Sequence, residues 1–81
     1  MTLDEPLTEE MCYKAGLCPV GGHQQRYFVP MSNYVIDFRR GFIGRGLCGA
    51  TAFAWPNPIK VRHLQALCVL AGYELDLEKL L

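Results

Sequence analysis

The length, composition and charge of the chain restrict it to a small globular protein without a membrane span. The chain has 81 residues, of which 51% are hydrophobic and 20% charged, a balance too apolar for disorder and a length near the lower limit for one core. No apolar run is long enough to span a membrane, and the acidic start does not resemble a signal peptide. We therefore expect one domain over residues 1–81, with residues 1–7 flexible or draped over the surface, in the cytoplasm of a host cell.

Positive and negative charges balance to a formal net charge of zero, but they occupy different parts of the sequence. The first ten residues and the last eight are acidic, whereas the middle of the chain is basic. The basic residues of the middle are Lys14, Arg26, Arg39, Arg40, Arg45, Lys60 and Arg62, with Asp37 as the one acid among them. This segregation favours a basic surface that binds a partner of opposite charge.

The first element expected along the chain is a short helix over Glu9–Ala15. Thr8 is a good N-cap residue, two acids lie in the first turn, and Gly16 can end the helix in a left-handed conformation. The next stretch, residues 18–23, is rich in glycine and proline and predicts a loop.

A hairpin is expected next, with strands over residues 24–29 and 34–40 and a turn over residues 30–33. In the second strand, Tyr34, Ile36 and Phe38 alternate with Val35, Asp37 and Arg39, the pattern of a half-buried antiparallel strand. The glycines of residues 41–46 argue against regular structure there, and residues 50–55 predict a third strand, with a helical turn as the alternative.

A long helix over residues 56–72 is the clearest element of the sequence. Asn57 suits the N-cap, Pro58 the first turn and Gly72 the C-terminal end. The apolar stripe of this helix consists of Val61, Leu64, Leu67, Cys68 and Ala71. Residues 73–77 then alternate like a short edge strand, or Asp76 caps a final helical turn.

Together these elements predict an α+β fold. A small two- or three-stranded antiparallel sheet would pack on one long C-terminal helix, with the short N-terminal helix at an edge or end of the sheet.

The candidate partner-binding site is centred on residues 38–46, where three arginines alternate with aromatics and glycines. Guanidinium groups can bind carboxylates or phosphates through two hydrogen bonds, and aromatic rings can stack on a partner. The alternative is a solvated loop whose arginines pair with the acidic termini. The residues predicted to bind a partner are Arg26, Arg39, Arg40, Phe42, Arg45, Lys60 and Arg62.

The cysteines at positions 12, 18, 48 and 68 are expected to be reduced thiols. A zinc site from Cys12, Cys18, His23 and Cys48 is an alternative, although the spacing lacks the close cysteine pairs of most zinc sites. A Cys18 nucleophile paired with His23 or His63 belongs to no motif, and so short a chain has little room for a substrate cleft. No catalytic residue, metal or cofactor is therefore expected.

The function predicted from these observations is non-enzymatic protein binding. The Arg-rich surface would dock on an acidic surface of a larger complex and block it sterically, as a phage or mobile-element inhibitor of the anti-CRISPR type would do. A nucleic-acid-binding module using the same arginines is the alternative, and a small zinc-stabilised domain is the second alternative. Apolar residues off the helix stripe, such as Val69 and Leu70, leave a homodimer open.

Overall fold

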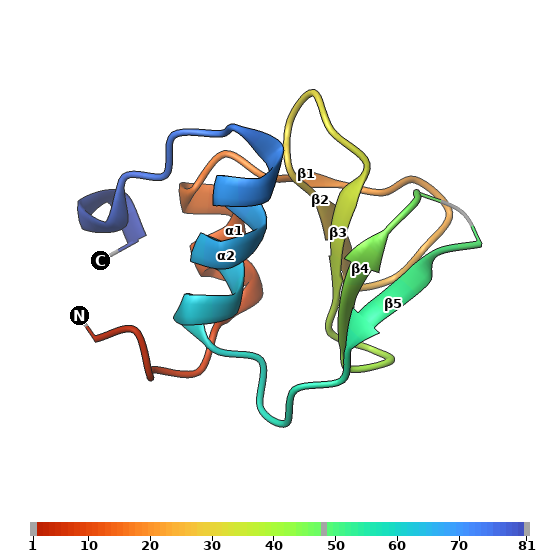
Figure 1. Ribbon diagram of the computed structural model, residues 1–81, viewed down its shortest axis with the longest axis horizontal. Coiled ribbons are helices and arrows are strands. Elements are labelled where there is room, and N and C mark those ends of the chain that lie inside the picture. The colour runs from red at the N-terminus through yellow and green to blue at the C-terminus, as the bar shows by residue number, and fades with distance from the viewer. Residues whose placement is uncertain (1, 48, 81) are drawn as a thin grey trace.

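The computed structural model describes residues 2–47 and 49–80, and within them a five-stranded antiparallel sheet lies beside a layer of helices (Figure 1). The strands are neighbours in the order of the sequence, from β1 to β5. The elements are α1 (Glu9–Lys14), β1 (Cys18–Pro19), β2 (Arg26–Phe28), β3 (Tyr34–Asp37), β4 (Phe42–Arg45), β5 (Thr51–Ala54), α2 (Val61–Ala71) and the 3-10 helix η1 (Leu77–Leu80).

The predicted two- or three-stranded sheet on one long helix is therefore wrong. The sheet has five strands in the described part of the chain, and α2 has only 11 residues. Two segments predicted as irregular, residues 18–23 and 41–46, contain β1 and β4, whereas the strand predicted over residues 50–55 is confirmed as β5.

Glycine was the misleading signal at β4, because Gly44 allows β5 to approach closely instead of breaking the strand. A Cβ atom on Gly44 would lie 2.3 Å from the carbonyl oxygen of Thr51. The strands β4 and β5 can therefore pair at this register only because position 44 has no side chain.

The start of α2 is displaced because the N-terminal segment pairs with the residues before it. The Leu7 amide donates to the Ile59 carbonyl (2.8 Å), and the Val61 amide donates to the Glu5 carbonyl (2.9 Å). These bonds keep the chain extended up to Lys60, which is the N-cap of α2 in place of the predicted Asn57. At its other end α2 stops at Gly72 in the left-handed region (φ 70°), as predicted.

The main core lies between one face of the sheet and the helices. Tyr27, Ile36 and Ile43 are paired across β2, β3 and β4, so their side chains share this face. The predicted stripe of α2 is confirmed, since Val61, Leu64, Leu67 and Cys68 are all buried and Ala71 is partly buried.

A second, smaller core covers the opposite face of the sheet, which the sequence did not predict. It is formed by Val20, Val35 and Phe42, with Phe28, Leu47, Ala50 and Ala52 packed around them. The connections that flank β1 and β5 supply several of these residues, so β3 is buried on both faces at its centre.

The caps of α1 and η1 are formed by neighbouring residues. The Thr8 side-chain oxygen accepts from the Met11 amide (3.2 Å), which confirms the predicted cap of α1. Of the two alternatives for residues 73–77, the capped final turn is right, since the Glu78 amide donates to Asp76 Oδ1 (3.0 Å) ahead of η1. Within residues 2–47 and 49–80, no helix combines the length and apolar character needed to cross a membrane.

Candidate functional site

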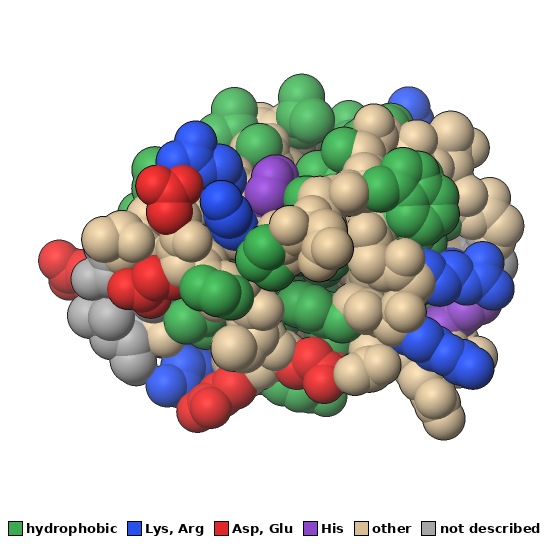
Figure 2. Space-filling model, turned by 90° about the horizontal axis from the view of Figure 1, so that it is seen from below, with side chains coloured by type: hydrophobic (Ala, Val, Ile, Leu, Met, Phe, Trp, Pro, Cys, Tyr) green, Lys and Arg blue, Asp and Glu red, His purple; other side chains and the backbone are tan. Residues whose placement is uncertain are grey.

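The residues predicted to bind a partner do not form one surface. Arg39 and Arg40 lie in the turn between β3 and β4, whereas Arg45 lies at the opposite end of β4, where it pairs with Tyr34. Lys60 and Arg62 belong to the start of α2. Figure 2 shows the consequence, because basic side chains gather near a histidine at each end of the visible face, with other side chains between the two groups.

Arg26 and Phe42 are part of the smaller core and are not available to a partner. The Arg26 side chain is 2% exposed, and its Nε donates to Asp37 Oδ2 at 2.9 Å. Its Nη1 donates to the Leu47 carbonyl (3.0 Å), and its guanidinium carbon lies 5.5 Å from the centre of the Phe42 ring. Strand register places Arg26, Asp37 and Phe42 in one row, so the cation is neutralised inside the sheet.

The remaining cations differ in their availability. Arg62 pairs with Asp4, although the alternative from the sequence had the arginines of residues 38–46, not Arg62, pair with the acidic termini. At the cap of α2, the Lys60 amide donates to His63 Nδ1 at 2.8 Å. Arg39, Arg40 and Arg45 are exposed, and none of the ion pairs within the described residues involves them.

The cysteine chemistry considered from sequence finds little support. Cys12, Cys18 and Cys68 are free thiols, and Cys48 lies outside the described residues. Burial is the main cause that raises the pKa of Cys12 to about 12, with Glu9 and Cys68 adding to it, and burial raises the pKa of Cys68 to about 11. Burial thus disfavours the thiolate form of Cys12, one of the four residues of the zinc alternative, whereas Cys18, the candidate nucleophile, is partly exposed. Among the described residues, no three His, Cys, Asp or Glu side chains gather as a metal site requires.

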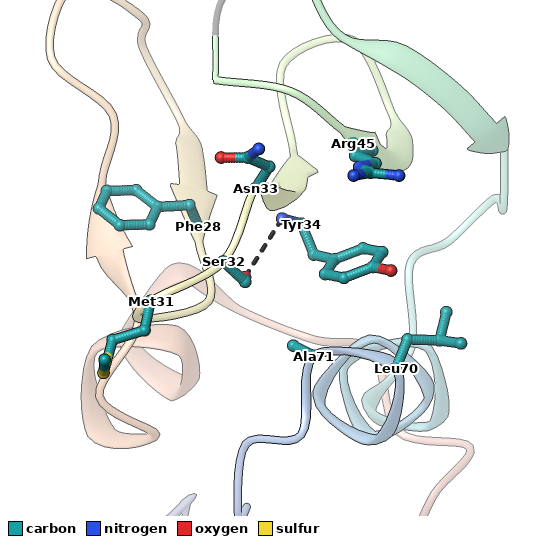
Figure 3. Close-up of a pocket in the computed structure, with 8 residues that line it drawn as sticks. All are labelled: Phe28, Met31, Ser32, Asn33, Tyr34, Arg45, Leu70 and Ala71. Carbon is teal, nitrogen blue, oxygen red and sulfur yellow. Dashed lines mark hydrogen bonds between the residues drawn. The ribbon is translucent and has the colours of Figure 1, made fainter.

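A groove lies where the turn between β2 and β3 meets the C-terminal end of α2. It has a volume of about 510 Å³ and is lined by Phe28, Met31, Ser32, Asn33, Tyr34, Arg45, Leu70 and Ala71. Figure 3 shows the Tyr34 ring between Arg45, which comes from β4, and Leu70, which comes from α2. The turn that forms one wall is held by Ser32, whose Oγ accepts from the Tyr34 amide (3.2 Å).

Large apolar side chains are exposed along this groove. Leu70 is 62% exposed and Met31 is fully exposed. Beside them, the Phe53 side chain of β5 is half exposed, and its ring centre lies 6.0 Å from that of Tyr34. An exposed apolar patch rimmed by polar groups is typical of an interaction surface.

The sequence held one signal for this groove. Leu70 is apolar but lies off the buried stripe of α2, so the sequence pattern indicated an apolar side chain outside the core. The groove itself was missed, since it combines residues 28–34 with Arg45 and Leu70, which only the folded chain brings together.

Comparison of the chain with protein-family models, with curated proteins and with solved structures finds no match. A functional interpretation is therefore built on the groove and on the exposed arginines.

Proposed function

We propose that this protein is a small non-enzymatic protein-binding module whose groove takes up an acidic, apolar segment of a larger partner protein. The observation that carries the proposal is that Arg45 lines the same groove as exposed apolar side chains, with the Tyr34 ring between Arg45 and Leu70.

The apolar part of the proposed partner segment follows from the exposed side chains. Covering one leucine-sized side chain contributes about 1.5–3 kcal/mol to binding before the costs of association. Leu70 of α2 and Phe53 of β5 are exposed and both lie near the Tyr34 ring, so they offer apolar surface to an inserted side chain. Met31 is exposed in the turn at the far side of the groove and points away from Leu70 (Figure 3). Tyr34 adds an aromatic ring of the kind enriched in binding hot spots.

The acidic part follows from charge complementarity. Arg45 is the only charged side chain among the described residues that line the groove. A guanidinium group next to an apolar surface favours a carboxylate, which it can bind through two parallel hydrogen bonds. The acidic partner predicted from the sequence is retained, but of the seven residues predicted to bind it only Arg45 is among the described residues that line the groove.

The inhibitor, nucleic-acid and zinc predictions made from the sequence differ in how far the folded positions of their residues support them. Inhibition of a larger host complex by a phage or mobile-element protein of the anti-CRISPR type stays a prediction. The nucleic-acid alternative has less support, because Arg26 and Phe42 are buried in the smaller core. The zinc alternative has less support because no three His, Cys, Asp or Glu side chains gather among the described residues, to which Cys48 does not belong.

Selection from a displayed peptide library tests the proposal without a known partner. The wild-type protein should enrich peptides in which Asp or Glu flanks a large apolar residue. Leu70→Asp and Arg45→Glu should each lose these peptides. Val69→Asp is the matched control, because Val69 is 74% exposed on the same helix and does not line the groove.

Three outcomes would contradict the proposal. The first is the absence of any enriched peptide, and the second is enrichment that survives Leu70→Asp. The third is a dimer in sedimentation analysis that Leu70→Asp dissociates, which would assign the groove to a second copy of the chain.

A further inference from the structure

We propose that a second pocket, at the other end of the hairpin formed by β3 and β4, binds a single phosphate group, either free or as a phosphomonoester. This pocket has a volume of about 230 Å³. It is lined by Gly22, His23, Gln24, Arg26, Asp37, Arg39 and Arg40. None of these described residues also lines the groove, so the inference is independent of the proposed function.

The residues of the pocket favour a polar anion. No apolar side chain is among the described residues that line it, and its three arginines face a single carboxylate. Both oxygens of Asp37 are already in use, since Oδ2 accepts from Arg26 Nε (2.9 Å) and Oδ1 accepts from the Arg40 amide (2.8 Å). The exposed guanidinium groups of Arg39 and Arg40 therefore set the charge that a ligand meets.

The two loops that form the pocket are held beside each other by hydrogen bonds. The Phe38 amide donates to the Gln25 carbonyl (2.9 Å), which joins the turn between β3 and β4 to the loop that carries His23. The Gly41 amide donates to the Asp37 carbonyl (2.8 Å), and Gly41 has the positive φ of 77° that this tight turn requires. The backbone supporting the arginines is thus largely formed before a ligand arrives, which lowers the cost of binding.

Phosphate is the anion that this chemistry suits best. Arginine binds phosphate oxygens through two hydrogen bonds, and an imidazole N–H adds a further donor from His23. Gly22 carries no side chain, and a Cβ atom placed there would meet nothing within 4 Å, so a ligand can approach its backbone.

A single phosphate group is favoured over a nucleic-acid strand. The other arginines do not continue the site, because Arg45 lies at the opposite end of β4 and Arg62 pairs with Asp4. Phe42, which was predicted to stack on a partner, is buried. The pocket is also smaller than the ~300 Å³ at which sites for larger organic ligands begin.

An NMR titration with sodium phosphate, at an ionic strength kept constant with sodium chloride, tests the inference. We expect saturable shifts of the backbone amide signals of Gly22, His23 and Gly41. The double variant Arg39→Gln, Arg40→Gln should bind about tenfold more weakly or worse, which matches the loss of charged hydrogen bonds. Both side chains are exposed, and unchanged amide signals in the core would show that the variant folds.

Lys79→Gln is the matched control, since it removes one exposed cation that does not line the pocket and should leave phosphate binding unchanged. Phenyl phosphate distinguishes the two sources of the group: tighter binding than free phosphate assigns the site to a phosphomonoester, and weaker binding assigns it to the free ion. The inference is overturned if no titration saturates or if Lys79→Gln weakens binding as much as the double variant. Tighter binding of a single-stranded oligonucleotide than of phenyl phosphate, with the salt dependence of several phosphate contacts, would also overturn it.

Discussion

At the scale of single residues, Arg26 and Asp37 form an ion pair in the interior of the protein. Both side chains are almost completely buried, at 2% and 3% exposure. Removal of water from two charges is costly, and only their mutual bond and the extra hydrogen bonds to Leu47 and Arg40 offset that cost. Removing either side chain would therefore leave the other as an unpaired buried charge and destabilise the fold.

The Asp37→Ala substitution should destabilise the protein by about 3–5 kcal/mol, because it leaves a buried guanidinium group without its counter-charge. Asp4→Ala is the matched control. It breaks the exposed pair with Arg62, whose side chains are 51% and 66% exposed, and should cost no more than about 1 kcal/mol. Urea unfolding of both variants measures the difference. Equal losses in the two variants would show that the buried pair has no special weight.

The Gly44→Ala substitution tests the close approach of β4 and β5. The added Cβ would lie 2.3 Å from the Thr51 carbonyl oxygen and 2.9 Å from Ala52 Cα, both of them backbone atoms that cannot rotate away. We expect a loss of stability of about 1–3 kcal/mol, as for other overpacked sites.

Gly21→Ala is the control for this prediction, since a Cβ on Gly21 would meet nothing within 4 Å. Its free energy of unfolding should change by less than about 0.5 kcal/mol, as for most surface substitutions. A Gly44→Ala protein as stable as Gly21→Ala would contradict the β4–β5 register.

At the scale of elements, α2 divides into a buried stripe and an exposed face. Leu67 is 1% exposed and belongs to the main core, whereas Leu70 is 62% exposed beside the groove. Leu67→Ala should cost about 2–5 kcal/mol, because it removes packed methyl groups and leaves a cavity. Leu70→Ala should change stability by less than about 0.5 kcal/mol. Thermal or urea unfolding checks both, and similar losses would contradict the orientation of α2.

The cap of α2 makes stability depend on pH. Burial, and then the charges of Arg62 and Lys60, lower the pKa of His63 below its ordinary value of 6.5. Below that pH the unfolded chain binds a proton that the folded chain resists, because protonated Nδ1 cannot accept from the Lys60 amide. The contribution of His63 to stability is therefore complete above pH 6.5 and is lost as the pH falls below it.

Unfolding at pH values on either side of 6.5 measures this dependence. His63→Asn keeps an acceptor at the cap but does not titrate, so the fall in stability on acidification should become smaller. His23→Asn is the control and should keep the contribution of His63. An unchanged pH dependence in His63→Asn would show that the imidazole is accessible to protons in the folded state.

Elements that depend on neighbouring residues could be predicted from the sequence. The Thr8 cap, the stripe of α2, its end at Gly72 and the hairpin of β2 and β3 all follow from local patterns of this kind. The start of α2 could not be predicted, because it is set by hydrogen bonds to residues 3–7, more than fifty positions earlier in the chain.

The charge of Arg26 led to a wrong prediction that it is exposed, because its position also depends on a residue that the fold brings next to it. An arginine in a strand is normally exposed, and its burial here depends on Asp37, the carboxylate opposite it on β3. Arg26 and Phe42 contact each other in the interior, so neither belongs to the predicted surface. The strand register places Arg45 at the opposite end of β4 from Arg39. Composition shows which charges exist, whereas register decides where they are.

At the scale of the whole molecule, the sheet carries two different surfaces at opposite ends of the β3–β4 hairpin. The groove combines apolar side chains with Arg45, whereas the described residues that line the smaller pocket are polar residues and glycine. None of the described lining residues belongs to both sites. We expect saturation of the smaller pocket with phosphate to leave peptide binding in the groove unchanged within about twofold, since coupling needs a shared two-state element. Peptide titrations with and without phosphate check this expectation.

The most direct test of the account is a charge-reversal cycle between Arg45 and the acidic residue of a selected peptide. Arg45→Glu should weaken binding of the acidic peptide by about tenfold or more, and a peptide with Lys in place of that acid should recover most of the loss. Val69→Asp should leave the affinity unchanged. If the two charge reversals instead weaken binding independently, Arg45 does not face the acid, and the proposed binding mode of the groove is wrong.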